Sequence, residues 1–267
     1  MSDPKAMPTG WRPNPEKQAS DLARFPLGAV LGRTKTERVE RVLGLPPGFR
    51  EHYDQTKPYN EYDGTNSCIG QGVSQHLTLI EWLTDEKPIQ RDPYWLWETT
   101  KAGDPWPDTQ PGDNSGTDLN TALRVVRDEG HVRAGKGKAK KPRPALGISE
   151  WRWIDPTRAV DEVRAAVALG MPVVVGSPWS DGMSRTTEEE GQRFVVPDLA
   201  FGNLGHCWLV NGALDSVEAV TTPNSWGEGW THGKPHACLS SELVGELFRA
   251  GGQGAVVTSR TREEKKT

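Results

Sequence analysis

The spacing of apolar residues changes part of the way along this 267-residue chain, and this change restricts the fold. In the first part, apolar side chains recur at intervals of three and four, which predicts helices over residues 68–83 and 119–129. In the second part, short apolar runs between turn-forming residues predict strands, over residues 171–179, 206–214, 216–223 and 236–240. Helices followed by strands predict the α+β fold class with two lobes.

Composition suggests how the chain is divided. Residues 1–43 are polar, charged and broken by proline and glycine, so we interpret them as an extension with one short helix at its end, over Thr36–Leu43. We expect one domain over residues 44–252, mainly helical over about 50–145 and mainly β over 146–252. A charged tail is expected over residues 253–267.

Charge and hydropathy exclude several classes of partner. The formal net charge is −4 and no run approaches the ~20 apolar residues that span a bilayer, so we expect neither nucleic acid nor a membrane as a partner. The basic run at residues 133–145 contains no aromatic residue, so a solvated loop is favoured over a polyanion contact. The polar start lacks an apolar segment, so we expect no secretory signal and synthesis in the cytoplasm.

The three cysteines are too few and too sparse to indicate a disulfide framework. Cys68 stands where a helix is predicted to begin, and the unpaired N–H groups and dipole of a helix N-terminus stabilise a thiolate. We therefore expect a lowered thiol pKa and a nucleophile at neutral pH. The alternative interpretation is a small buried residue without a chemical role.

His206 and Asn224 are candidate partners for such a thiolate. His206 opens an apolar strand, which places its ring at the end of that strand, where the fold can bring a cysteine close. Asn224 follows 18 residues later in PNSWGEGW and can accept the imidazole N–H, while Trp226 can cover that hydrogen bond. Each of these residues has an ordinary structural explanation when it is taken alone.

In combination, these motifs resemble the papain family of cysteine peptidases, in the form found in bacteria and phages. Ser67-Cys68 precedes a helix, Gly205-His206 precedes an apolar strand, and NSWGEGW occupies residues 224–230. The order Cys, His, Asn and the 138 residues between the cysteine and the histidine agree with the family.

The resemblance covers about residues 45–250, and GTDLNTALRVVRDEG at 116–130 adds a weaker similarity. It implies a papain-like two-lobed fold with a cleft between the lobes. Cys68 would lie in a helical left lobe, and His206 and Asn224 in an antiparallel, β-barrel-like right lobe.

One position departs from the family pattern. The family has a glutamine six residues before the cysteine, which donates to the oxyanion, and this chain has Tyr62 there. The Tyr62 hydroxyl, or Gln55 through an altered loop, is the candidate replacement. Losing one oxyanion donor costs on the order of 10²–10³ in rate. Ser67, beside Cys68, and Trp226 are expected to support the site.

The resemblance implies a thiol peptidase without a cofactor. By the family mechanism Cys68 attacks an amide carbonyl, His206 protonates the leaving amine, and water releases the acyl-enzyme. The expected substrate is a protein or a peptide, with a peptidoglycan stem peptide as one option. Similarity to phage members suggests a virion-associated or assembly role, in which residues 1–43 lie across the cleft, are trimmed, or bind an assembly partner.

Three other interpretations stay open on the sequence alone. A catalytically weak structural protein with a papain fold is the main alternative, and an acyltransferase with the same three residues is another. Zinc binding is disfavoured, because the spacing of His232, His236 and Cys238, with Cys207 further away, matches no common ligand pattern. We expect Cys207, next to His206, to be buried and inert.

Overall fold

The computed structural model describes residues 10–14, 26–28, 38–56, 64–85, 87–135, 141–202 and 205–260. Its helices are α3 (Phe49–His52), α4 (Cys68–Asp85), α5 (Pro93–Lys101), α6 (Leu119–Asp128), α7 (Ala159–Ala168), α8 (Gly227–Trp230) and α9 (Ser241–Arg249). Its strands are β1 (Glu40–Val42), β2 (Ile148–Trp153), β3 (Val173–Pro178), β4 (Thr186–Glu189), β5 (Gln192–Val195), β6 (Gly205–Val210), β7 (Gly212–Leu214), β8 (Ala219–Thr222), β9 (Ala237–Ser240) and β10 (Gln253–Arg260). Short 3₁₀ turns occupy Pro144–Leu146, Pro156–Arg158, Gly182–Ser184 and Asp215–Val217.

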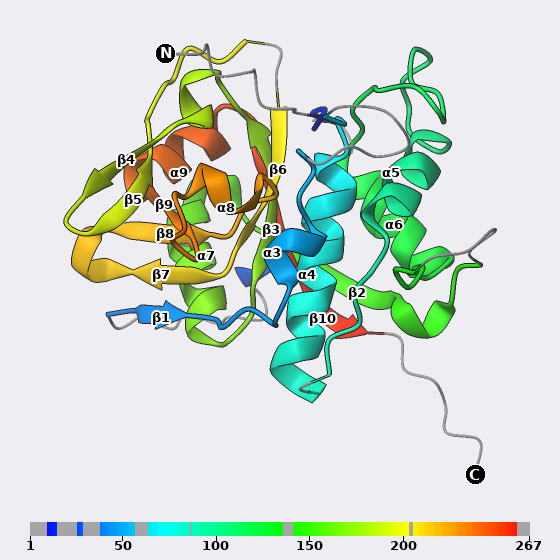
Figure 1. The fold of residues 1–267 in the computed structure, drawn as a ribbon, viewed down its shortest axis with the longest axis horizontal. Coiled ribbons are helices and arrows are strands. Elements are labelled where there is room, and N and C mark those ends of the chain that lie inside the picture. The colour runs from blue at the N-terminus through cyan, green and yellow to red at the C-terminus, as the bar shows by residue number, and fades with distance from the viewer. Residues whose placement is uncertain are drawn as a thin grey trace.

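Two lobes lie side by side, as Figure 1 shows. In one lobe α5 and α6 pack against α4. In the other, the described strands form a six-stranded sheet in the order β1-β7-β8-β9-β5-β4, and α7 and α9 lie beside it. A four-stranded sheet, β2-β10-β3-β6, lies between them and packs against α4 through β3 and β6. The fold is therefore α+β.

Most of the buried apolar residues form one large core in each lobe, and a smaller third cluster contains Phe49, Tyr53, Leu79 and Leu209. The core of the β lobe includes Val163 on α7, Leu247 on α9 and Val220 on β8. The core of the helical lobe joins Leu77 on α4 and Leu123 on α6 to residues of the four-stranded sheet. Cys68 belongs to the second core, at the boundary between the lobes.

α4 begins at Cys68, where the apolar spacing predicts a helix. Two glycines in its first turns have a packing reason. A Cβ atom on Gly70 would lie 1.9 Å from the Pro93 carbonyl oxygen, and one on Gly72 would lie 2.5 Å from Cys207 Sγ. Glycine therefore lets α4 approach α5 and β6 closely, which offsets its low helix propensity.

This close packing predicts opposite effects at two helical glycines. Gly70→Ala is expected to lower the free energy of unfolding by about 1–3 kcal/mol, because the new methyl group forces the backbones apart. Gly245→Ala on α9 is the control: its Cβ would meet nothing closer than 3.7 Å, so a gain of about 0.5–1 kcal/mol is expected. Urea unfolding measures both, and a Gly70→Ala variant as stable as the unaltered protein would contradict the packing argument.

Several predicted elements differ from the structure. The helix expected over Thr36–Leu43 is wrong, because residues 40–42 form β1 and pair with β7. Residues 186–189 and 192–195, which lie outside the strands predicted from the sequence, form β4 and β5. Residues 253–260, assigned to a charged tail, form β10 between β2 and β3. That strand is buried on both faces over most of its length, so it lacks the alternation that marks a half-buried strand.

None of the described helices is both long enough and apolar enough to cross a bilayer.

Candidate active site

Cys68 is fully buried at the first position of α4, where the two lobes meet. The backbone N–H groups of Gly10 and Cys207 lie close enough to its thiol to favour the thiolate, as do those of Ile69 and Cys68 itself. The second contact places the sulfur beside the residue that follows His206 on β6. The Cys68 thiol therefore lies where the N-terminus of α4 meets β6.

The protonation state of Cys68 differs from the expected one. Burial raises the pKa of the thiol to about 12, and the surrounding N–H groups only partly oppose this rise. The expectation of a lowered pKa is therefore wrong for the conformation described here. The reason is that no water reaches the sulfur. The loss of solvation destabilises the thiolate by more than the N-terminus of α4 stabilises it.

His206 and Asn224 form a direct hydrogen bond. His206 Nε2 lies 2.7 Å from Asn224 Oδ1, which also accepts the Ser225 N–H at 2.7 Å. Since that side-chain atom accepts from a backbone N–H, it is the amide oxygen, and Nε2 must carry the imidazole proton. His206 Nδ1 therefore holds a lone pair, and it has no hydrogen-bond partner among the described residues. The ring is prepared to receive a proton at Nδ1.

His206 is neutral in this environment. Burial lowers the pKa of the imidazole to about 4, against the opposing effect of the Asn224 hydrogen bond. Asn224 itself is held from three sides. Its backbone N–H donates to Thr222 Oγ1 at 3.1 Å, its carbonyl oxygen accepts from Gln75 Nε2 on α4 at 3.0 Å, and its φ of 51° lies in the left-handed region.

Tryptophan rings enclose the histidine. Trp226 stacks on His206 with the ring centroids 4.4 Å apart, and Trp179 meets the same imidazole edge-on at 5.0 Å. Trp230 packs against Trp226 in turn, at 5.4 Å. This apolar surrounding excludes water from the His206–Asn224 hydrogen bond, which strengthens it.

Gln55 lies beside the same group. Its side-chain Oε1 accepts from Ser225 Oγ at 2.5 Å, and its backbone N–H donates to the Ser225 carbonyl at 2.8 Å. Its Nε2 lies 3.4 Å from the carbonyl oxygen of Thr65, whose hydroxyl shares a 2.7 Å hydrogen bond with Ser67. The Gln55 carboxamide is thus held between Ser225, which follows Asn224, and Thr65, which lies shortly before Cys68. Tyr62, the other oxyanion candidate, lies outside the described residues.

A segment from the N-terminal extension covers the thiol. The N–H groups of Gly10 and Trp11 donate to the Gly205 carbonyl at 2.9 and 3.0 Å, next to His206. On the opposite lobe, Thr117 donates to the Gly10 carbonyl at 2.8 Å and accepts from the Arg12 N–H at 2.9 Å. We call residues 10–12 the cover segment. It bridges both lobes directly over the cysteine.

The cover segment also holds the residues that sequence reasoning missed. Gly10 fits only as glycine, because a Cβ there would lie 1.9 Å from the Asn66 carbonyl oxygen. Arg12 binds Asp108 through two nitrogens, at 3.0 and 2.8 Å. The signal available in the sequence was a lone large aromatic, Trp11, beside a glycine in an otherwise polar stretch.

The residues considered for zinc do not form a site. Among the described residues, no group of three or more histidine, cysteine or acidic side chains is arranged to hold a metal ion. Cys207 and Cys238 lie on β6 and β9, which belong to different sheets. Cys207 is buried against Gly72 of α4, and burial keeps its pKa well above the ordinary value.

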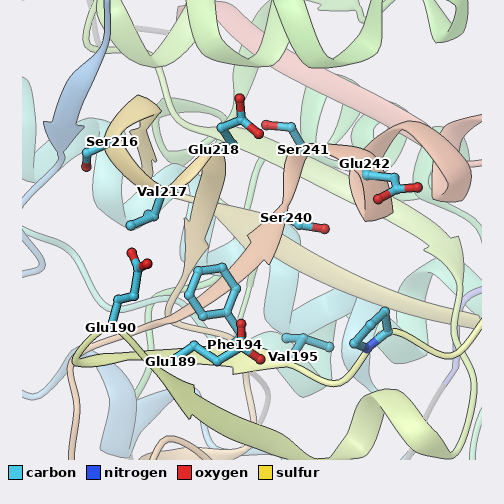
Figure 2. A pocket seen from close by; sticks show the side chains of 11 residues that line it. Glu189, Glu190, Phe194, Val195, Ser216, Val217, Glu218, Ser240, Ser241 and Glu242 are labelled. Atoms are coloured by element: carbon cyan, nitrogen blue, oxygen red, sulfur yellow. The ribbon is translucent and has the colours of Figure 1, made fainter.

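A separate hollow of about 570 Å³ lies in the β lobe. Figure 2 shows its acidic side chains, Glu189, Glu190, Glu218 and Glu242, around Phe194. None of its lining residues belongs to the group around Cys68. The acidic hollow is therefore not part of the candidate active site.

Comparison with known proteins agrees with this geometry at the level of the fold. No protein-family model matches the sequence, and no curated protein matches it. Among solved structures, the chain is similar to xylellain, a cysteine protease from Xylella fastidiosa, with a TM-score of 0.66 and 16% identity over 97% of this chain and 99% of that one.

Two further similar structures are described as proforms. The Amb a 11 cysteine protease, a major ragweed pollen allergen, has a TM-score of 0.58 at 18% identity, covering 91% of this chain and 74% of that one. The proCathepsin B S9 of Trypanosoma congolense has a TM-score of 0.59 at 10% identity, covering 96% and 88%. The chain therefore has the papain-like α+β fold of these cysteine proteases.

Proposed function

We propose that this chain is a cysteine peptidase that hydrolyses peptide bonds, with Cys68 as nucleophile, His206 as acid and base, and Asn224 as the residue that orients the imidazole. One observation carries the proposal. The Cys68 thiol lies beside the backbone N–H of Cys207, the residue next to His206, and the imidazole has its Nε2 fixed by Asn224 and its Nδ1 without a hydrogen-bond partner among the described residues. A neutral imidazole held in this tautomer is the base that a thiol nucleophile requires.

The chemical steps follow from this arrangement. His206 Nδ1 takes the thiol proton, and the Cys68 sulfur attacks the carbonyl carbon of the scissile amide. The imidazolium then gives its proton to the leaving amine, which leaves an acyl group on Cys68. Water, deprotonated by the same Nδ1, hydrolyses the thioester. Asn224 stabilises the imidazolium by accepting a hydrogen bond from its Nε2–H throughout.

We assign the oxyanion hole to the backbone N–H of Cys68 and the side-chain amide of Gln55. Two hydrogen bonds to Ser225 hold Gln55 beside the catalytic group, and its Nε2 points toward the segment that enters α4. A fixed amide donor of this kind stabilises the developing negative charge without reorganising. Gln55 thus takes the role for which the sequence offered Tyr62 and Gln55 as alternatives.

The conformation described here is the closed state of this peptidase. The cover segment donates two backbone hydrogen bonds to the Gly205 carbonyl and lies beside the fully buried Cys68, so a substrate cannot reach the sulfur until the segment leaves. Its departure admits water and removes the desolvation that keeps Cys68 a thiol and His206 neutral. Proton transfer from Cys68 to His206 is then favoured, as the mechanism requires.

The substrate of this site is a protein or peptide, and a peptidoglycan stem peptide is one option. A virion-associated role, with the first 43 residues binding an assembly partner, stays a prediction from the sequence. The alternative of a catalytically weak structural protein is disfavoured by the preserved hydrogen bond between His206 and Asn224, since a structural protein has no need of a lone pair held at Nδ1.

Labelling with an epoxysuccinyl peptide tests the function. We expect intact-mass spectrometry to show one adduct on Cys68, formed faster in a Gly10→Val/Trp11→Ala variant, because the valine collides with Asn66 and drives the cover segment out. This Gly10→Val/Trp11→Ala protein is the open variant. Adding His206→Ala should slow the labelling strongly, whereas Cys238→Ala, at a buried thiol on β9, is the control and should not change it. Equal labelling with and without His206 would contradict the proposal.

A further inference from the structure

One helix carries both the proposed nucleophile and a side chain that reaches the orienting residue. Cys68 is the first residue of α4, and Gln75 follows about two turns later on the same side of the helix. Gln75 is fully buried, and its Nε2 donates to the Asn224 carbonyl oxygen at 3.0 Å. This hydrogen bond crosses from the helical lobe to the turn that follows β8 in the β lobe.

The hydrogen bond holds a peptide group that acts on the His206–Asn224 pair. The Asn224 carbonyl and the Ser225 N–H belong to one planar peptide group, so a contact that fixes the first also fixes the direction of the second. That N–H donates to Asn224 Oδ1 at 2.7 Å, and the same oxygen lies 2.7 Å from His206 Nε2. The contacts therefore form a continuous series from the amide of Gln75 to the imidazole.

The backbone conformation of Asn224 needs such support. Its φ of 51° lies in the left-handed region, which asparagine enters more readily than most residues but still at a cost in free energy. Thr222 Oγ1 accepts the Asn224 N–H at 3.1 Å, and Gln75 is the partner of the Asn224 carbonyl among the described residues. The two contacts hold the peptide groups on both sides of the Asn224 Cα, so they oppose relaxation to an ordinary φ.

Stability alone does not explain a glutamine at this position. Because Nε2 faces the Asn224 carbonyl, Gln75 Oε1 points elsewhere, and it is buried without a hydrogen-bond partner among the described residues. A buried acceptor without a partner costs free energy and offsets much of what the single hydrogen bond contributes. What Gln75 supplies is geometry, and connected hydrogen bonds also polarise one another, which strengthens the contacts of Asn224 Oδ1.

We propose that Gln75 is a positioning residue of this site: it fixes the peptide group between Asn224 and Ser225, and thereby the Asn224 oxygen that orients the His206 imidazole. Because Gln75 lies on the helix that begins with Cys68, the same contact places the orienting residue relative to the nucleophile. This inference rests on the proposed peptidase function. It goes beyond that function by assigning a role to a residue outside the catalytic three.

The first test is the effect of Gln75→Met on kcat in the full-length open variant. Methionine has a similar length but no N–H, so the Asn224 carbonyl loses its donor. The substrate is the fastest-cleaved member of a coumarin-linked dipeptide library. We expect kcat to fall by at least about ten-fold and KM to stay within about two-fold, since a displaced catalytic group mainly affects the transition state. An unchanged kcat would overturn the inference.

Ser74→Ala is the matched control for this substitution. Ser74 precedes Gln75 on α4, and its buried Oγ lies 3.0 Å from His131 Nε2. The control therefore removes a buried hydrogen bond from the same helix without touching Asn224. It should leave kcat within about two-fold of the open variant.

The pH profile distinguishes positioning from a loss of stability. The Asn224 hydrogen bond raises the pKa of His206 against the effect of burial, so a displaced Asn224 oxygen stabilises the imidazolium less. The alkaline limb of kcat/KM, where the imidazolium loses its proton, should move to lower pH by at least about 0.5 unit in Gln75→Met. In Ser74→Ala this limb should stay in place. An unchanged limb in Gln75→Met would show that Gln75 acts only on packing.

Gln75→Glu tests the donated hydrogen bond itself, and it keeps the size of the native side chain in case Gln75→Met does not fold. Burial raises the pKa of a carboxyl group, and the protonated acid can donate its O–H to the Asn224 carbonyl, whereas the carboxylate repels that oxygen. The ratio of kcat in Gln75→Glu to kcat in the open variant should therefore fall between about pH 5 and about pH 9. A ratio that stays constant over this range would overturn the assignment.

A measurement on Cys68 alone separates this inference from the proposed function. Iodoacetamide alkylates the thiolate, which is paired with the imidazolium near pH 7 and forms without it at about pH 10. Gln75→Met should slow the alkylation at pH 7 by at least about three-fold and leave the rate at pH 10 unchanged. This result without any peptide hydrolysis would support the positioning role and reject the peptidase. Equal rates at pH 7 would reject the positioning role, whether or not peptides are hydrolysed.

Discussion

A Gln55→Leu substitution in the open variant is expected to lower kcat for peptide hydrolysis by about 10²–10³-fold, with a much smaller change in KM. The amide of Gln55 is the proposed side-chain donor to the oxyanion, and this charge exists only after the sulfur has attacked. Leucine has a similar size but no donor. The loss therefore falls on the transition state rather than on the binding of substrate.

The controls for this prediction follow from the two sequence candidates. Tyr62→Phe removes the hydroxyl of the other candidate donor, and it should leave kcat within about two-fold. Alkylation of Cys68 by iodoacetamide passes through no oxyanion, so it should proceed in Gln55→Leu at the rate of the open variant, which also shows that the site is still folded. A large loss in Tyr62→Phe with little loss in Gln55→Leu would assign the oxyanion hole to the tyrosine.

The fold was predictable where local patterns and packing agree. The helix that begins at Cys68 and the helix Leu119–Asp128 both appear where the apolar spacing predicts them, and the second is capped by Asp118, which accepts the Thr121 N–H at 2.9 Å. β10 was missed because it pairs on both sides and carries no alternation, and β1 because three residues are too few to show a period. Such strands are fixed by their partners rather than by their own sequence.

The pairing of His206 with Asn224 was predictable from the sequence, whereas the protonation state of Cys68 was not. Chemistry and spacing singled out His206 and Asn224, and the structure brings them within 2.7 Å of each other. The pKa of Cys68 was predicted with the wrong sign, because the helix N-terminus is visible in the sequence whereas its cover is not. The cover depends on contacts between residues far apart in the chain, such as the Gly10 N–H with the Gly205 carbonyl at 2.9 Å. Such a contact leaves no periodic trace in the sequence.

Acid is expected to destabilise the fold by several kcal/mol between pH 7 and pH 4.5. Burial lowers the pKa of His76 from 6.5 to about 3, and that of His206 from 6.5 to about 4. Below pH 6.5 these two histidines bind protons in the unfolded chain but stay neutral in the folded chain. The free energy of unfolding therefore falls as the pH drops toward the pKa values of the folded state. Each unit of pKa difference is worth about 1.4 kcal/mol, so two such groups remove on the order of 5 kcal/mol at pH 4.5, a large share of the stability of a typical domain.

His76 offers the sharper test, because its role is purely structural. Its Nε2 accepts the Val257 N–H at 3.2 Å, which joins α4 to β10, and a protonated ring cannot accept that bond. His76→Gln keeps a polar side chain that does not titrate, so its free energy of unfolding, measured in urea at pH 7, 6 and 5, should fall less steeply than that of the unaltered chain. His232→Gln, at an exposed position, is the control and should leave the slope unchanged. A free energy of unfolding that stays constant from pH 7 to pH 5 would show that these buried rings accept protons without cost, and that water reaches the interface between α4 and β10.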